Sequence, residues 1–156
     1  MKNKFSLVVT GAAGFIGFSL IKKFLNNDIS VVGIDNLNNY YDLSLKKARL
    51  KILKDIALQK KVKFSFYKCS LENKKELKDV FDLEEPSIVV NLAAQAGVRY
   101  SIENPDAYFS SNLLGFGNIL DLSRQFKVEN FIFASSSSVY GGNIELPFKE
   151  SDKVDK

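Results

Sequence analysis

The 156-residue sequence contains no histidine, no tryptophan, only one cysteine and only three prolines. Without histidine the chain cannot form a Ser-His-Asp triad, and it lacks the side chain that most often binds metals in proteins. We therefore expect no metal site. The single Cys69 excludes an internal disulfide and fits a reducing compartment such as the cytoplasm. We expect it to be a small buried residue at the end of a strand.

Long hydrophobic runs and a strong charge imbalance are also missing. The first apolar run is short and is broken by glycines, unlike a signal peptide, and no run is long enough to cross a bilayer. The net charge is only +4, and lysines such as Lys46, Lys60 and Lys74 are spread along the chain. This spread is typical of solvated helix faces, and we favour that interpretation over nucleic-acid binding. Neither a membrane nor a nucleic acid is an expected partner.

The composition is that of a soluble globular protein. Hydrophobic residues make up 46% and charged residues 26% of the chain, and 13 phenylalanines and six tyrosines can supply a sizeable core. The length suits one domain.

The most informative stretch is FSLVVTGAAGFIG at residues 5–17. Residues 5–9 have strand character and lead into Gly11, and Gly14 and Gly17 follow at intervals of three. An apolar helical pattern then begins, carried by Phe15, Ile16, Leu20, Ile21, Phe24 and Leu25. A strand, a glycine turn and a helix N-terminus form a phosphate site, because the free backbone N–H groups and the helix dipole favour an anion. Gly11 permits the sharp turn, Gly14 the approach of a pyrophosphate, and Gly17 close packing of the helix on the strand.

A second apolar run, residues 29–34, ends at Asp35, which lies 18 residues after Gly17. A carboxylate at the end of the second strand can accept hydrogen bonds from a ribose 2′-OH. The alternative is a glycine turn with an unrelated surface aspartate. The order of strand, turn, helix, strand and acid disfavours it, and predicts a dinucleotide site.

The rest of the chain alternates between helical and strand-like patterns. We predict helices over 43–58, after Glu72 and from Pro105-Asp106, and strands over 62–66, 87–94 and 130–134. The strand over 62–66 alternates with polar residues and is expected at the sheet edge. The expected apolar face of the 43–58 helix is Leu45, Ala48, Ile52 and Ile56. The expected apolar face of the helix after Glu72 is Leu77, Val80 and Phe81. The expected apolar face of the helix from Pro105 is Leu113, Leu114, Phe116, Ile119, Leu120 and Phe126.

This alternation predicts an α/β fold with a doubly wound parallel sheet in the strand order 3-2-1-4-5. Ligands of such sheets bind beyond the carboxyl ends of the strands, at the switch between strands 1 and 4. The residues that fall at that edge are Gly11, Asp35, Ser70, 92–95 and 135–138.

Four motifs carry a resemblance to a known family: TGAAGFIG at 10–17, NLAAQAGVRYS at 91–101, SNLLGFGN at 111–118 and FASSSSVYGG at 133–142. Together with Asp35 they resemble the extended short-chain dehydrogenase/reductases of the NAD-dependent epimerase/dehydratase family, and most of all UDP-glucuronate 4-epimerases. The resemblance covers almost all of this chain but only the N-terminal half of a typical member. It implies an incomplete NAD-binding Rossmann domain over 1–142, truncated at its C-terminal side. Residues 143–156 would be a polar tail leading to a missing substrate domain.

The resemblance also implies site residues where the motifs match. The residues expected to bind NAD are Gly11, Gly14, Phe15, Ile16, Gly17, Asp35, Asn36, Asn38, Ser70, Leu71, Leu92, Ala93, Ala94, Gln95 and Asn112. Ser136, flanked by Ser137 and Ser138, is implied to be catalytic, although a strand-end turn hydroxyl is the alternative for each serine. Arg99 and Ser101 are implied to lie near the sugar. Because no arginine occurs at 36–39 to neutralise a 2′-phosphate, NAD is expected rather than NADP.

The implied activity is NAD-dependent epimerisation of a UDP-sugar through a 4-keto intermediate. The family's base is the tyrosine of a Tyr-x-x-x-Lys motif, and none of the six tyrosines here has lysine four residues later. We therefore expect this chain to be inactive alone. The resemblance further implies polysaccharide biosynthesis, a cytoplasmic location and a homodimer of the complete protein.

There are three alternatives to this assignment. A non-catalytic NAD-binding module fits the missing motif equally well, and a nucleotide-sugar dehydratase or decarboxylase shares the same N-terminal half. A methyltransferase is disfavoured, because it does not account for three glycines at steps of three or for the serine run.

Overall fold

The computed structural model describes residues 6–154, which form a five-stranded sheet in the order β3-β2-β1-β4-β5. Every pair of neighbouring strands is parallel. The strands are β1 (Leu7–Thr10), β2 (Val31–Asp35), β3 (Phe64–Lys68), β4 (Ile88–Asn91) and β5 (Asn130–Phe133). The predicted strand order is therefore confirmed. The predicted first strand began at Phe5, which lies outside the described residues.

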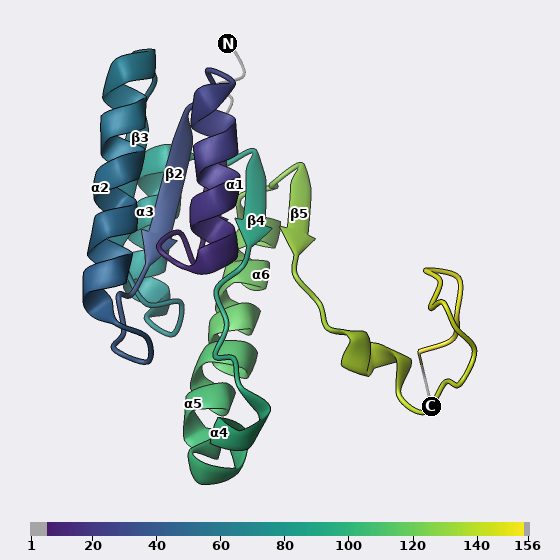
Figure 1. Cartoon of the computed structure of the whole chain (residues 1–156). Helices are drawn as coiled ribbons and strands as arrows, with labels where there is room; N and C mark the ends of the chain where they lie inside the picture. Colours follow the sequence, from purple (N-terminus) through teal and green to yellow (C-terminus); the bar gives the residue numbers. More distant parts are fainter. Residues whose placement is uncertain (1–5, 155–156) are drawn as a thin grey trace.

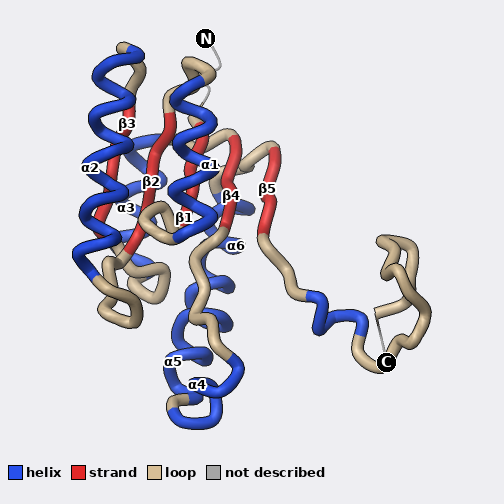
Figure 2. The backbone as a smooth tube through the Cα atoms, viewed as in Figure 1, coloured by secondary structure: helices blue, strands red, loops and turns tan. Residues whose placement is uncertain are grey.

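Helices cover both faces of the sheet (Figures 1 and 2). On one face lie α1 (Phe15–Asn26) and α2 (Leu43–Lys60), and on the other lie α3 (Lys74–Glu84) and α6 (Phe116–Gln125). The short α4 (Val98–Glu103), α5 (Pro105–Tyr108) and the π-helical segment Phe109–Gly115 lie beyond the carboxyl ends of the strands. After β5 a 3-10 turn, Ser137–Tyr140, leads into a tail that runs away from the sheet (Figure 1).

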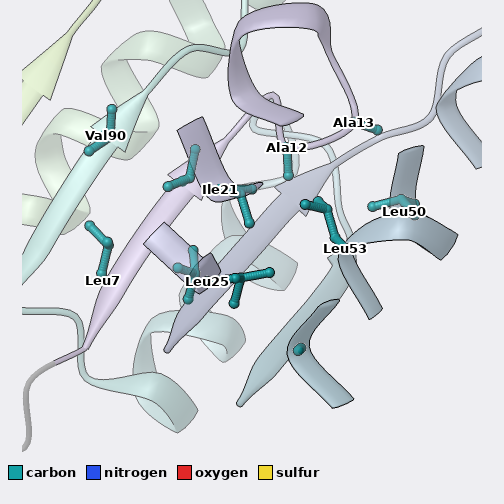
Figure 3. Close-up of a cluster of buried hydrophobic side chains, with 11 residues drawn as sticks. Leu7, Ala12, Ala13, Ile21, Leu25, Leu50, Leu53 and Val90 are labelled. Carbon is teal, nitrogen blue, oxygen red and sulfur yellow. The ribbon is translucent and has the colours of Figure 1, made fainter. Parts of the chain in front are cut away.

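The core has two layers because β1 is buried on both faces and its side chains alternate between them. Leu7 and Val9 pack with α1 and α2, where Ile21, Leu25 and Leu53 have no exposed surface (Figure 3). Val8 packs on the other side. The buried residues around it there include Val32, Ile34, Leu77, Phe81, Val89, Ile119 and Leu122.

The predicted apolar face of α2 was wrong at three of its four positions. Leu45, Ala48 and Ile52 are exposed, whereas Ile56 packs against the core as predicted, and the buried residues are Lys46, Leu50, Leu53 and Ala57. The helix carries two neighbouring apolar stripes, so its period alone did not decide which one meets the sheet.

The helix expected from Pro105 is divided into α5, the π-helical segment and α6. Ile119 is buried as expected and Phe126 packs against the same core cluster, but Leu113, Leu114 and Leu120 are exposed. At the start of α1, Phe15 and Ile16 keep 75% and 61% of their surface exposed, so they are not part of the core.

Both edges of the sheet are open among the described residues. β3 pairs only with β2, as predicted for an edge strand, and β5 pairs only with β4. On β5, Ile132 and Phe133 keep more than half of their surface exposed.

Candidate functional site

The glycine turn after β1 is built by close backbone contacts. Gly11 has φ +65°, and a Cβ there would lie 2.9 Å from backbone atoms of Leu92 and Ala93. The Gly14 N–H donates to the Gly11 carbonyl at 2.9 Å. Gly14 is also the N-cap of α1 and has no side chain to cap it, so the first N–H groups of α1 remain free to bind a ligand.

Asp35, at the end of β2, is 7% exposed. Its Oδ2 accepts from the Ala13 N–H at 3.0 Å and its Oδ1 from the Leu37 N–H at 2.8 Å. The carboxylate therefore joins the glycine turn to the loop that follows β2. Because a carboxylate oxygen has two lone-pair sites, each oxygen can still accept from a ligand hydroxyl.

Lys46, in the first turns of α2, faces this carboxylate. Its Nζ donates to Asn38 Oδ1 at 2.8 Å and lies 3.7 Å from Asp35 Oδ1. The two charged side chains are only 8% and 6% exposed. The interpretation of Lys46 as part of a solvated helix face was wrong. No sequence signal separated it from its lysine-rich neighbours, because only the packing of α2 decides which lysine points inward.

A pocket opens at the carboxyl ends of β1, β2 and β4, and it encloses about 730 Å³ including its mouth. Predicted site residues that line it are Gly11, Gly14, Asp35, Asn36, Asn38, Leu71, Leu92, Ala93, Ala94 and Gln95. The sequence analysis missed Ile34, Tyr40, Tyr41, Lys46, Cys69, Glu72 and Ser111. The predicted switch point between strands 1 and 4 therefore lies at a real concavity.

Glu72 and Ser111 line one side of the pocket, and they belong to a hydrogen-bonded group with Ser70, which was predicted to bind the cofactor but lies outside the lining. Glu72 accepts from the Ser70 hydroxyl, and from the Ser111 hydroxyl at 2.7 Å. Ser70 Oγ also accepts from Asn36 Nδ2 at 3.4 Å. Burial raises the pKa of Glu72, but the hydrogen bonds from Ser70 and Ser111 outweigh it and hold that pKa below its usual value. The wall therefore carries a negative charge at neutral pH.

A further part of the pocket lining, residues 92–95, is held in place by two polar side chains. Thr10 Oγ1 accepts from the N–H groups of Leu92 and Ala93, both at 3.1 Å. The Asn112 side chain forms two hydrogen bonds with the backbone of Gln95: it accepts from the Gln95 N–H at 2.8 Å and donates to the Gln95 carbonyl at 3.0 Å. Asn112 thus does not line the pocket but fixes a segment that does.

Comparison with known proteins identifies the family of the chain. The sequence profile of the GDP-mannose 4,6 dehydratase family matches residues 8–155. The chain belongs to this family. The resemblance to NAD-dependent epimerases and dehydratases is thereby confirmed.

Relatives of this family member include Protein CapI of Staphylococcus aureus, 52% identical over 96% of this chain and 43% of CapI. A UDP-glucuronate 4-epimerase of Thermodesulfobacterium geofontis is 44% identical over 95% of this chain and 44% of its own length. Among solved structures, the UDP-glucose 4-epimerase of Thermus thermophilus in complex with NAD is 31% identical, with a TM-score of 0.74 over 94% of this chain and 43% of that one. The chain therefore spans less than half the length of these relatives.

Several predicted site residues of this family member lie away from the pocket lining. Ser136, Ser137 and Ser138 are exposed on the segment after β5, where Ser136 Oγ accepts from the Ser138 N–H at 3.2 Å. On α4, Arg99 is exposed and Ser101 donates to the Val98 carbonyl at 2.6 Å. The predicted cofactor residues Phe15, Ile16 and Gly17 lie on the first turn of α1, outside the lining. Between 6 and 154, no helix has the length and apolar character of a membrane span.

Cys69 is 4% exposed and lies against the pocket, as expected for a buried strand-end residue. Burial, together with the charges of Glu76, Glu72 and Asp79, raises the pKa of its thiol from 9.0 to about 11. Since the thiolate is the reactive form, we expect Cys69 at pH 8 to react roughly 100-fold more slowly with a disulfide reagent than a thiol of pKa 9. The rate of colour release from Ellman's reagent measures this. The urea-unfolded chain serves as the control, and equal rates in the two states would contradict the prediction.

Proposed function

We propose that the pocket binds NAD and that the chain is the cofactor-binding part of a nucleotide-sugar 4-epimerase. The observation that carries the proposal is the Asp35 carboxylate, held by the Ala13 N–H in one pocket with Gly11 and Gly14. This arrangement supplies a ribose acceptor beside a phosphate-binding helix N-terminus. Several solved relatives are UDP-glucose 4-epimerases in complexes with NAD, which supports the same assignment.

Each part of the pocket would have a separate task. The backbone at Gly11 and Gly14 and the N-terminus of α1 would hold the pyrophosphate, and Asp35 would accept from the adenosine ribose hydroxyls. The segment 92–95, fixed by Thr10 and Asn112, would form the wall along the cofactor. When bound, NAD supplies a nicotinamide that can accept a hydride from the sugar and return it.

For the substrate we propose a UDP-hexuronic acid or UDP-hexose. A curated relative at 44% identity is named UDP-glucuronate 4-epimerase, and another at 42% is named probable UDP-glucuronate 4-epimerase, which supports UDP-glucuronate in particular. Ser136 would hydrogen-bond the reacting sugar hydroxyl. Residues 1–142 would form the cofactor domain, and 143–156 would lead toward the parts that bind the sugar.

A serine hydroxyl holds its proton too tightly to act as base without a partner, and the chain contains no histidine and no Tyr-x-x-x-Lys. We therefore expect the 156-residue chain to bind NAD but to show no measurable epimerisation. Loss of a positioned acid/base alone costs about 10²–10⁴-fold in rate.

The test combines calorimetric titration with NAD and chromatography of products after long incubation with UDP-glucuronate and UDP-glucose. A natural relative that includes the Tyr-x-x-x-Lys motif is the positive control for turnover. Absence of NAD binding would overturn the proposed cofactor site. Turnover by the purified 156-residue chain would overturn the assignment of the base to a residue outside it.

A non-catalytic NAD-binding module remains the second candidate function. The observation that favours it is the exposure of Ser136, Ser137 and Ser138 away from the pocket lining. In a longer protein that includes the Tyr-x-x-x-Lys motif, Ser136→Ala distinguishes the two. The epimerase assignment expects turnover to fall while NAD affinity stays unchanged, and a module without catalysis shows no turnover in either form.

A further inference from the structure

We infer that a contact between Tyr40 and Tyr100, here called the tyrosine bridge, closes the pocket where β1 ends and sets the rate at which the cofactor exchanges. This role rests on the proposed function, because the dinucleotide is the ligand whose entry and exit the bridge controls. Tyr40 and Tyr100 are then positioning residues for the two loops around the site, and neither is required to touch the ligand.

The tyrosine bridge joins two parts of the chain that the sheet keeps apart. Tyr40 lies in the loop between β2 and α2, and Tyr100 lies on α4, after β4. In the sheet, β1 lies between β2 and β4, so these two strands are about 10 Å apart (Figure 2). The centroids of the Tyr40 and Tyr100 rings are nevertheless only 5.0 Å apart, with the ring planes tilted by 44°. The contact therefore crosses the carboxyl end of β1.

Both loops that the bridge joins belong to the pocket. Tyr40 and Tyr41 line it from the β2 side, and residues 92–95 line it from the β4 side. Between them, Gly11 and Gly14 line the pocket at the end of β1. A ligand that reaches the glycine turn lies between these two loops. The bridge must therefore open before a molecule as long as a dinucleotide can enter or leave.

The β4 side of the bridge is fixed by a third tyrosine. The Tyr108 hydroxyl donates to the carbonyls of Ala96, at 2.9 Å, and Gly97. Gly97 has φ +102°, and a Cβ at this position would overlap the Tyr40 hydroxyl. Tyr40 thus packs against the backbone of the segment that follows β4 as well as against the Tyr100 ring. Because Gly97 has no side chain, the two loops can approach this closely.

The two rate constants of binding distinguish a bridge from a ligand contact. Loss of one aromatic pair corresponds to a change of about three- to tenfold in an equilibrium, so we expect the open fraction to rise by that factor in Tyr40→Ala. Because opening precedes both entry and exit, the association and dissociation rate constants are expected to rise together. Their ratio, Kd, is then expected to change by less than about twofold, whereas loss of a ligand contact acts mainly on dissociation.

The experiment follows the exchange of NADH, the fluorescent reduced form of NAD, by stopped-flow fluorescence. Mixing NADH with the 156-residue chain gives the association rate constant. Displacement of bound NADH by an excess of NAD gives the dissociation rate constant. Both are measured for the wild type and for each variant under the same conditions.

Further variants make the result specific. Tyr100 is outside the pocket lining, and Tyr100→Ala is expected to accelerate both steps as Tyr40→Ala does. The double variant is expected to be no faster than either single variant, because the bridge is already lost in each. Tyr40→Phe keeps the ring and is expected to keep slow exchange. The matched control is Tyr140→Ala, which removes the stacking partner of Phe148 outside the lining and is expected to leave both rate constants unchanged.

The outcomes separate the bridge from the proposed function. Wild-type rate constants in both Tyr40→Ala and Tyr100→Ala would overturn the inference alone. Faster dissociation without faster association would also overturn it, because the side chain would then be a contact of the ligand. If Tyr40→Ala does not fold, Tyr100→Ala carries the same test. Failure of the wild-type chain to bind NADH or NAD would overturn the proposed function together with the inference.

Discussion

Gly17→Ala is expected to destabilise the fold by about 3 kcal/mol or more, against a typical total stability of 5–15 kcal/mol. A Cβ at position 17 would lie 2.1 Å from the Gly11 carbonyl oxygen and 2.8 Å from its carbon. Both atoms belong to the backbone of the tight turn, so no side-chain rotation relieves the clash. Either α1 must move away from β1 or the turn must open, and each change disturbs the buried contacts of Ile21 and Leu25. Urea unfolding followed by far-UV circular dichroism measures the loss.

Gly117→Ala is the matched control for this substitution. Gly117 lies in α6, and a Cβ there would have no atom within 4 Å other than those of its own stretch of helix backbone. Because alanine favours the helix over glycine by about 1 kcal/mol, this variant should be slightly more stable than the wild type. Equal effects of the two substitutions would show that the contact at Gly17 is not the cause.

Asp35→Ala is the second substitution expected to have a large effect, and it should act on stability as well as on the cofactor. Removing the carboxylate leaves the buried Lys46 without its counter-charge and the N–H groups of Ala13 and Leu37 without their acceptor. Loss of one partner of a buried ion pair typically costs about 3–5 kcal/mol. We expect a loss of stability near the lower figure, with a loss of NAD affinity of about 1–3 kcal/mol.

A double-mutant cycle separates these contributions. In Asp35→Ala/Lys46→Met, the stranded charge is gone, so we expect part of the lost stability to return while NAD binding stays weak. Unfolding curves and calorimetric titrations of all four proteins give the coupling energy. Additive effects on stability would contradict the ion-pair explanation and would assign the loss to the two backbone N–H groups.

The features that could be predicted from the sequence are those set by neighbouring residues along the chain. The glycine turn directly follows β1 and Asp35 is the last residue of β2, so their place at the carboxyl edge follows once the strands are identified. The order of the sheet follows from the alternation of elements and the handedness of crossovers.

The features that could not be predicted depend on how surfaces meet in space. Lys46 looks like Lys47 in the sequence, and only the contact of α2 with α1 and the sheet turns one inward and leaves the other in water. Likewise Glu72 and Ser111 are 39 residues apart and meet only because α3 and α6 cover the same face. The expected face of α2 was wrong for the same reason: its period allowed two stripes, and the packing selected the one that includes Lys46.

The pairing of β1 with β4 has a consequence for the order in which the protein assembles as it is made. Leu7 pairs with Ile88 and Thr10 with Asn91, so the central strand meets its second neighbour only after 81 further residues exist. At about 5–20 residues per second, that interval during translation is on the order of ten seconds. Once β3 has been made up to Lys68, the last 23 residues before Asn91 are still to come, and during that shorter time β1, β2 and β3 can form a three-stranded sheet in which β1 is an open edge. The ribosome-bound chain thus presents to chaperones and to other nascent chains an edge that the finished protein buries.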